Sequence, residues 1–215
     1  MSIHQIVSGV PYDSNIFLLR GSSNVLIDTG TGIASQVVSD RIRSLVGDGR
    51  LDAVLLTHCH VDHIGGLSRI IEEFGSTAYA LPPDSDPIRT ADSTYTLDLH
   101  FGLSLDPVDV VDLYPGEVID IEQHRLRVIP APGHTSGGVC FLDEVTGSLF
   151  SGDTVFLDGV GRTDFPSGSL SQLRSTLQSL GNIEINGLYP GHGGCTDTGG
   201  SVCIRRGLRM VGEGN

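Results

Sequence analysis

Short apolar runs separated by turns fill the first quarter of the chain and predict β-strands. Residues 15–30 contain two such runs around a Gly-Ser-Ser turn, which is a hairpin pattern, and residues 52–57 contain a third run bounded by polar residues. Residues 33–46 instead space their apolar side chains at helical intervals, before a Gly-Asp-Gly sequence breaks the pattern. The predicted order is therefore strand, strand, helix, strand.

The middle of the chain continues this alternation. Residues 63–75 predict a helix that ends at Gly75, and residues 77–82 predict a further strand. Residues 82–105 begin rich in Pro, Asp and Ser and then become mixed, which predicts loop with some helix. We expect this segment to be the insertion that shapes a substrate pocket.

The second half repeats the logic of the first. Residues 118–134 predict strand, turn, strand and loop, and residues 137–156 predict a hairpin. Residues 169–180 form an amphipathic helical pattern with Ser169 as its cap, and residues 187–194 form a short strand and loop. Because hairpin-joined strands alternate with helices, the chain predicts an α/β fold with mixed sheets covered by helices.

Composition and charge narrow the functional classes. The 215 residues, 39% of them hydrophobic, are enough for one domain, which we expect to span residues 1–215. The net charge of −13 argues against a nucleic-acid partner, because such proteins usually present a basic face to phosphate. The chain contains no run of about 18 apolar residues, so no membrane span is expected. We therefore expect a small-molecule substrate, with no nucleic acid and no membrane as partner.

The cysteines and the beginning of the chain indicate a compartment. The four cysteines are scattered and form no CxxC pair, which is not the pattern of a disulfide framework. The first residues lack the basic and long apolar stretches of a signal peptide. The expected location is the cytoplasm, with reduced thiols.

Residues 57–66, THCHVDHIGG, concentrate three of the eight histidines within six positions. In an extended segment, side chains two positions apart point the same way, so His58 and His60 can face one point while Cys59 faces away. Asp62 and His63 lie at the predicted start of the next helix and can approach from another side. We interpret Cys59 as a packed spacer, and the other four side chains as metal ligands.

Three more candidate ligands follow predicted strands elsewhere in the chain. His134, Asp153 and His192 each lie beside glycine, where backbone can come close to a shared centre. Imidazole and carboxylate together suit zinc, iron, manganese or cobalt. The predicted metal ligands are His58, His60, Asp62, His63, His134, Asp153 and His192. The remaining histidines have no comparable sequence surroundings.

The order of these motifs resembles the metallo-β-lactamase fold superfamily. THCHVDHIGG is followed by PGHTSGG, SGDTVF and PGHG, and the resemblance covers nearly the whole chain. It implies a four-layer αββα sandwich with two divalent metal ions at one edge, zinc in the first place and iron or manganese as alternatives. A dinuclear site of this composition keeps a net positive charge, so a bound water would lose its proton near neutral pH.

Position by position, the resemblance implies a role for each ligand. One ion would be bound by His58, His60 and His134, and the second by Asp62, His63 and His192. Asp153 would bridge the two ions, and Asp62 and Asp153 are the implied catalytic residues. Asp28 matches the acidic residue of a DTG motif and is expected either to support the metal ligands or to serve only as a turn residue.

Departures from related branches favour a short glyoxalase-II-like form. The commonest zinc β-lactamases have cysteine in place of Asp153, and flavodiiron proteins have glutamate in place of His60. The sequence Gly161-Arg162-Thr163-Asp164 resembles both glyoxalase-II-like thioesterases and persulfide dioxygenases. We expect Arg162 to brace this loop through Asp164, with binding of a substrate carboxylate as the alternative.

The predicted activity follows from that branch. The chain ends about 23 residues after His192, so the C-terminal helical domain that helps typical glyoxalase II bind glutathione is expected to be missing. The resemblance implies hydrolysis of an acyl thioester by a metal-bridging hydroxide. The alternative is a mononuclear iron persulfide dioxygenase, which shares the same motifs.

Overall fold

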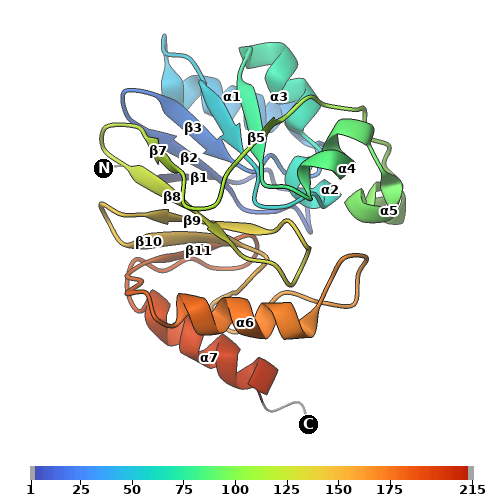
Figure 1. Ribbon diagram of the computed structural model, residues 1–215. Coiled ribbons are helices and arrows are strands. Elements are labelled where there is room, and N and C mark those ends of the chain that lie inside the picture. The colour runs from blue at the N-terminus through green and yellow to red at the C-terminus, as the bar shows by residue number, and fades with distance from the viewer. Residues whose placement is uncertain (1–2, 213–215) are drawn as a thin grey trace.

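Two β-sheets packed face to face form the centre of the computed structural model, which describes residues 3–212 (Figure 1). In the first sheet, three antiparallel strands continue into three parallel ones. In spatial order, its strands are β1 (Ile3–Ile6), β2 (Ile16–Arg20), β3 (Asn24–Ile27), β4 (Ala53–Leu55), β5 (Thr77–Ala80) and β6 (Val111–Asp112).

The second sheet is built by the second half of the chain. Its pairs are antiparallel except for the parallel pair β10 and β11. In spatial order, its strands are β11 (Leu188–Pro190), β10 (Ser148–Gly152), β9 (Val139–Asp143), β8 (Arg125–Pro130) and β7 (Val118–Asp120). Both sheets are thus mixed, as the hairpin patterns predict.

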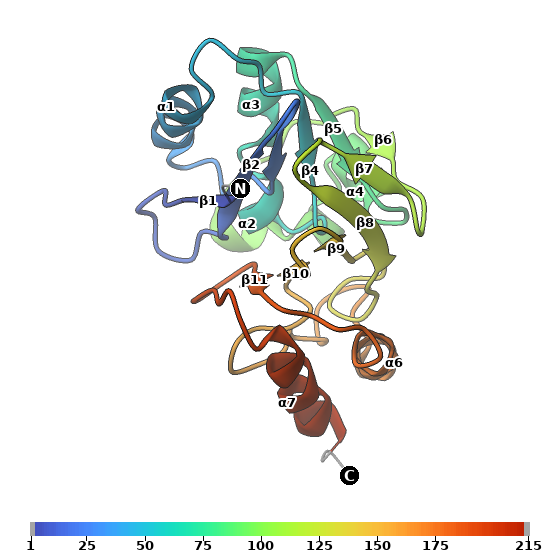
Figure 2. The ribbon, with the colours of Figure 1, turned by 90° about the vertical axis from the view of Figure 1, so that its left-hand side faces the viewer.

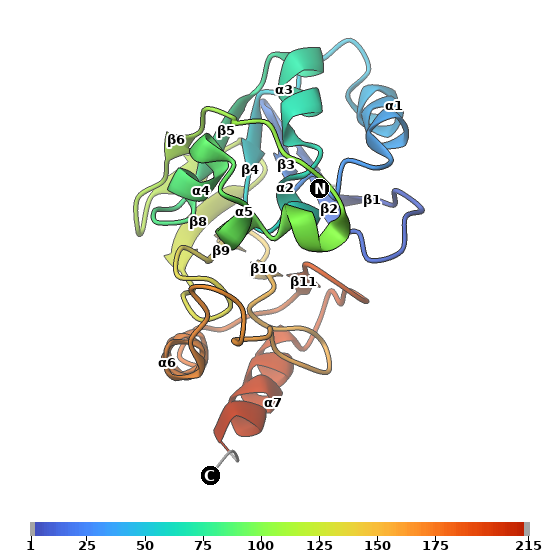
Figure 3. The ribbon, with the colours of Figure 1, turned by 90° about the vertical axis from the view of Figure 1, so that its right-hand side faces the viewer.

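Helices cover the outer face of each sheet. Figures 1, 2 and 3 show α1 and α3 against the first sheet, and α6 and α7 against the second. The helices are α1 (Ser35–Val46), α2 (Val61–Ile64), α3 (Leu67–Phe74), α4 (Ser85–Thr90), α5 (Ser93–Thr96), the 3₁₀ helix η1 (Asp98–Phe101), α6 (Leu170–Leu180) and α7 (Gly200–Gly212). The predicted four-layer αββα sandwich is confirmed.

Three clusters of apolar side chains lie between the four layers of helices and sheets. Alternation along β2 shows the arrangement, since Leu18 packs toward α1 and α3 while Phe17 and Leu19 pack between the sheets. Phe141 and Phe150 meet them from the second sheet. A third apolar cluster joins the second sheet to α6 and α7. The two sheets are therefore fixed face to face by buried side chains.

Most of the predicted elements form, with two differences. The predicted helix 63–75 is two short helices, because Gly65 and Gly66 press against the backbone of Thr31 and Thr29 and turn the chain. Strands β1 and β6 and helix α7 have no counterpart among the predicted elements. The Ser169 side chain does accept the Gln172 backbone N–H at the start of α6, as predicted. Within residues 3–212, no helix is long and apolar enough to cross a membrane.

Candidate metal centre

All seven predicted ligand side chains lie at one edge of the two sheets. Four of them follow β4, where the chain leaves the first sheet and turns into α2. The other three follow β8, β10 and β11 of the second sheet. The seven residues are His58, His60, Asp62, His63, His134, Asp153 and His192. The centre therefore depends on both halves of the fold.

The first group comprises His58, His60 and His134, whose ligand nitrogens lie within 4.8 Å of one another. His134 Nε2 lies 2.9 Å from His60 Nδ1, and the three rings meet edge to face. Three imidazole nitrogens that converge in this way can hold a metal ion.

The second group comprises Asp62, His63 and His192, again with ligand atoms within 4.8 Å of one another. Asp62 Oδ2 lies 3.1 Å from His192 Nε2. Asp62 and His63 lie in α2, while His192 follows β11. One carboxylate and two imidazoles can therefore hold a second divalent ion.

Asp153 lies between the two groups and contacts both. Its Oδ1 is 3.3 Å from His63 Nε2, and its Oδ2 is 3.6 Å from both His134 Nε2 and His192 Nε2. Gly191 comes so close to Asp153 that any side chain in its place would collide with the carboxylate. The carboxylate thus has the position expected of a bridge between two ions.

Unpaired buried atoms indicate that this cluster suits a metal. His58 Nε2, His63 Nε2 and Asp153 Oδ1 are buried and have no hydrogen-bond partner. Buried polar atoms in proteins nearly always have a partner, and leaving one without costs about 1–3 kcal/mol. Lone pairs of nitrogen and oxygen that converge on one region are satisfied together by a divalent cation. The donor set therefore fits the metal that the sequence predicts, without identifying it.

The electrostatics of the cluster leave suitable lone pairs. Burial and then the neighbouring His134 lower the pKa of His60 to about 3, and burial lowers the pKa of His58 well below its usual value. Burial would raise the pKa of Asp153, but the surrounding histidines, with His63 foremost, hold it well below its usual range. At neutral pH these groups are neutral imidazoles and an ionised carboxylate, which are the forms that bind metals.

Asp28 orients one of the ligands. Its Oδ2 lies 2.7 Å from His63 Nδ1, and its Oδ1 accepts the Thr57 backbone N–H at 2.8 Å. Burial would lower the pKa of His63, but Asp28 and other carboxylates outweigh it and raise that pKa well above its usual value, so a metal ion would displace a proton from Nε2 on binding. The Nδ1 contact leaves Nε2 directed at the centre, so Asp28 supports a ligand and is more than a turn residue.

The loop at Gly161-Arg162-Thr163-Asp164 supports a second ligand. The Arg162 backbone oxygen lies 2.7 Å from His134 Nδ1, and Gly161 approaches Asp153 so closely that a Cβ would fall 1.8 Å from its backbone oxygen. The Arg162 side chain donates to both oxygens of Asp164, at 2.9 and 2.6 Å. The predicted bracing by Arg162 is confirmed.

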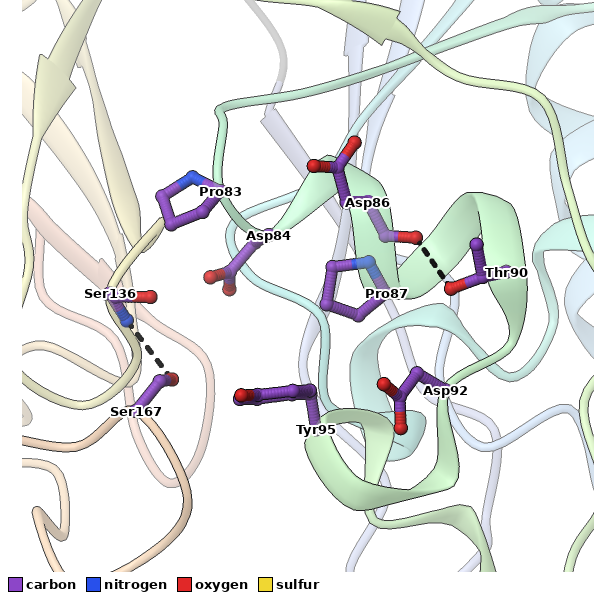
Figure 4. Close-up of a pocket in the computed structure, with 9 residues that line it drawn as sticks. All are labelled: Pro83, Asp84, Asp86, Pro87, Thr90, Asp92, Tyr95, Ser136 and Ser167. Atoms are coloured by element: carbon purple, nitrogen blue, oxygen red, sulfur yellow. Dashed lines mark hydrogen bonds between the residues drawn. The ribbon is translucent and has the colours of Figure 1, made fainter.

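Asp84 connects the two loops that carry the first group of ligands. Its Oδ2 accepts the Cys59 N–H at 3.0 Å, and its Oδ1 accepts the Gly137 N–H at 2.6 Å. Burial raises the pKa of this carboxyl, although the hydrogen bonds act against it. Figure 4 shows Asp84 between α4 and the loop of Ser136, in a separate pocket. No sequence pattern pointed to Asp84.

Cys59 has the spacer role predicted for it. Its side chain is buried in the apolar cluster between the first sheet and the helices that cover it, and its Sγ lies 3.6 Å from the Tyr95 backbone oxygen. Burial raises the pKa of its thiol well above the usual value. The thiol therefore stays neutral and points away from the metal ligands.

A pocket of about 360 Å³ opens above the metal ligands, and sequence reasoning missed most of its wall. Segment 82–105 was expected to shape such a pocket, and it supplies three of the lining side chains. Spacing gave no signal for the others, because they lie in loops without periodicity. Besides metal ligands and the Gly161–Arg162 loop, the lining residues are Tyr12, Leu97, His100, Phe101, Phe156, Val160 and Phe165.

Fold and ligand set together define a metal-binding αββα protein, and comparison with known families gives the same result. The model of the metallo-β-lactamase superfamily matches residues 9–192, and the chain belongs to that family. A probable metallo-hydrolase of Methanocaldococcus jannaschii is 34% identical over 193 residues, which cover 87% of this chain and 91% of the relative.

Two further relatives bear on the branch. The hydroxyacylglutathione hydrolase GloC of Haemophilus influenzae is 31% identical over 181 residues, which cover 81% of this chain and 82% of the relative. The crystal structure of TTHA1623 in a di-iron-bound form matches with a TM-score of 0.75 at 29% identity, covering 87% of this chain and 91% of the other. The predicted family is confirmed, and the chain is a metal-binding member of a metallo-hydrolase superfamily.

Proposed function

We propose that the protein hydrolyses an acyl thioester with two divalent ions, zinc in the first place, as a glyoxalase-II-like enzyme of the cytoplasm. The observation that carries this proposal is the position of Asp153, which contacts ligands of both three-residue groups. A bridged pair of ligand groups favours a dinuclear centre over a mononuclear one. The relatedness to a hydroxyacylglutathione hydrolase supports a thioester as the reacting bond.

The ions would supply a nucleophilic water at neutral pH and polarise the acyl carbonyl. The chain's own residues divide the remaining tasks. His58, His60 and His134 would hold one ion, and the second group of three would hold the other. Asp153, which contacts histidines of both groups, would hold the two groups together around the ions.

Asp62 is the second proposed catalytic carboxylate. It belongs to the second ligand group and also lines the pocket, where a bound substrate can reach it. We assign to it the proton released when water attacks the acyl carbon. The carbon–sulfur bond then breaks, and the sulfur leaves as thiolate with the electron pair of that bond. Exclusion of bulk water falls to the aromatic wall of the pocket.

Metal content and an activity panel test this proposal. Metal-replete protein is expected to carry two ions per chain and to hydrolyse thioesters. Asp153→Ala should lower metal content and abolish turnover, because the bridge is lost. The matched control is Cys59→Ala, which changes a buried side chain between His58 and His60 that points away from the ligands. This variant should keep the metal content of the unchanged protein. Full activity and two ions in Asp153→Ala would contradict the assignment.

The same measurement distinguishes the alternative activity. One iron per chain, with oxygen consumed on a persulfide and no thioester cleaved, would replace the hydrolase by a mononuclear dioxygenase. The ligands of this alternative would be mainly His58, His60 or His134, and Asp153. Asp153 Oδ2 lies 3.6 Å from His134 Nε2, which is the observation that keeps this alternative.

A further inference from the structure

The wall of the pocket above the metal ligands is apolar and comes from three separate segments. Tyr12 lies in the loop between β1 and β2, Phe101 lies in η1, and Phe156 and Phe165 lie in the loop after β10. Leu97 adds an aliphatic contact and is almost fully buried. An apolar wall of this kind lowers the free energy of a bound apolar group by removing both surfaces from water.

The rim of this pocket keeps its aromatic side chains in water. Tyr12 is 82% exposed and Phe101 is 45% exposed. Exposed aromatic side chains beside a pocket are typical of a binding site, because a ligand can cover them. A substrate that covers both rings would gain contact area without moving the sheets.

Apart from the proposed metal ions, the described side chains that line this pocket offer no free cation to an anionic substrate. The chain contains no lysine, and Arg162 is the only arginine among the described lining residues. Its guanidinium is bound to both oxygens of Asp164 and lies 4.1 Å from the centre of the Phe165 ring. Apart from His100, the imidazoles of the pocket are those that the proposed function assigns to metal ions.

Glutathione and coenzyme A are anionic carriers, through carboxylates and phosphates respectively. Proteins bind such groups through arginine or lysine, and a carboxylate or phosphate without a partner loses hydration on binding. The net charge of −13 adds a repulsive field at longer range. Both effects work against an anionic carrier at this site.

We propose that the substrate is a thioester whose acyl group is apolar and whose thiol carries no charge. The inference rests on the proposed function for the reacting bond. What it adds is that the pocket prefers apolar, uncharged ligands. This preference can be measured as binding affinity, without any hydrolysis. It departs from the hydroxyacylglutathione substrate of the related hydrolase.

The first experiment compares matched substrates on metal-replete protein. Acetyl and hexanoyl thioesters of N-acetylcysteamine, an uncharged thiol, are compared with the same acyl groups on glutathione. We expect kcat/KM to rise about fourfold for each added methylene. We also expect the uncharged hexanoyl thioester to exceed hexanoylglutathione by about tenfold or more. Equal or faster cleavage of the glutathione thioester would overturn the inference.

Variants connect this selectivity to the wall. Phe101→Ser and Tyr12→Ser should each reduce the ratio of hexanoyl to acetyl kcat/KM several-fold, while Phe101→Leu should largely keep it. The control, Tyr114→Ser, removes an exposed aromatic ring that does not line the pocket, and should leave the ratio unchanged. An unchanged ratio in both pocket variants would also overturn the inference.

The affinities of ligands that cannot be hydrolysed test the pocket preference separately from the thioesterase activity. The S-hexyl thioethers of N-acetylcysteamine and glutathione cannot be hydrolysed, and their affinities are measured by calorimetry. If no thioester is cleaved but the uncharged thioether binds about tenfold more tightly, the thioesterase proposal fails and the inference on the pocket stands. If S-hexylglutathione binds as tightly or more tightly, the inference fails, whatever the turnover.

Discussion

At the scale of single residues, the metal centre depends on side chains that touch no ion. Asp84 shows this most directly, because one carboxylate accepts hydrogen bonds from the backbone of both Cys59 and Gly137. These two residues belong to the loops that carry His58, His60 and His134. One buried carboxylate therefore helps to hold together two loops that come from different sheets, beside the hydrogen bond from the Val139 N–H to the Thr57 oxygen.

Asp84→Asn is expected to weaken metal binding about 10- to 100-fold, the usual effect of losing a partner that orients the ligands. The amide has only one oxygen, so one backbone N–H faces an NH₂ group instead of an acceptor. Metal affinity, measured by competition with a chromophoric chelator, checks this.

Asp86→Asn is the matched control for Asp84→Asn. Asp86 lies two positions further along, is exposed, and pairs with Arg89. Its substitution should leave metal affinity unchanged. If Asp84→Asn lowered the free energy of unfolding but kept full metal affinity, Asp84 would be a purely structural residue.

The ligands themselves could be predicted from the sequence, whereas Asp84 could not. His58, His60, Asp62 and His63 are adjacent along the chain, and local spacing fixes their directions. Asp84 acts through two backbone N–H groups, one of them more than fifty positions away, and no residue pattern records such a contact. The pocket wall has the same character, since only folding brings Tyr12 and Phe101 to the same pocket.

At the scale of elements, the short helix α2 places two ligands because its end lies close to another loop. Thr29 donates its backbone N–H to the His63 oxygen at 2.7 Å. Gly65 has helical dihedral angles, and a Cβ there would fall 2.2 Å from the Thr31 backbone oxygen. The absence of a side chain at Gly65 therefore allows α2 to approach the edge of the first sheet.

Gly65→Ala should lower the free energy of unfolding by about 1–3 kcal/mol, because the methyl group overpacks a backbone contact. Intrinsic helix propensity predicts the opposite sign, since alanine is favoured over glycine by about 1 kcal/mol within a helix. Urea denaturation of the two proteins distinguishes these effects.

Gly212→Ala in α7 is the control for the substitution at Gly65. It is a helical glycine, is exposed, and has no heavy atom within 4 Å of the position of a Cβ. It should be neutral or slightly stabilising. If Gly65→Ala were equally neutral, the close approach of α2 would not be what requires glycine there.

Two helices with a repeating apolar face were predictable, whereas helix α7, which contains three glycines, and the shortest strands were not. Helices α1 and α6 each have an apolar face long enough to repeat, and their predicted ranges contain the observed ones. Strand β6 has only two residues and forms through pairing with β5, so local sequence holds little signal for it. The break between α2 and α3 depends on Thr29 and Thr31, which lie some thirty positions earlier.

At the scale of the whole molecule, the metal centre joins the two sheets at one edge. Four ligands follow β4 of the first sheet, and three follow strands of the second. Ions held by both sets bind the native state and lose most of their ligands on unfolding. Metal binding should therefore raise the free energy of unfolding of the whole chain.

Removal of metal is expected to lower the melting temperature. Free metal at about 100 times its dissociation constant stabilises the native state by about 2.7 kcal/mol per site, which is about 5–10 °C for a chain of this size. The shift should grow with the logarithm of metal concentration, because linkage is logarithmic. Calorimetry of chelator-treated protein at rising zinc or iron concentrations measures it.

Cys59→Ala should show the full shift and Asp153→Ala a reduced one, since only the latter loses a contact shared by both ligand groups. A melting temperature independent of metal would mean that the ligands bind no ion in the native state, and the dinuclear centre would have to be abandoned.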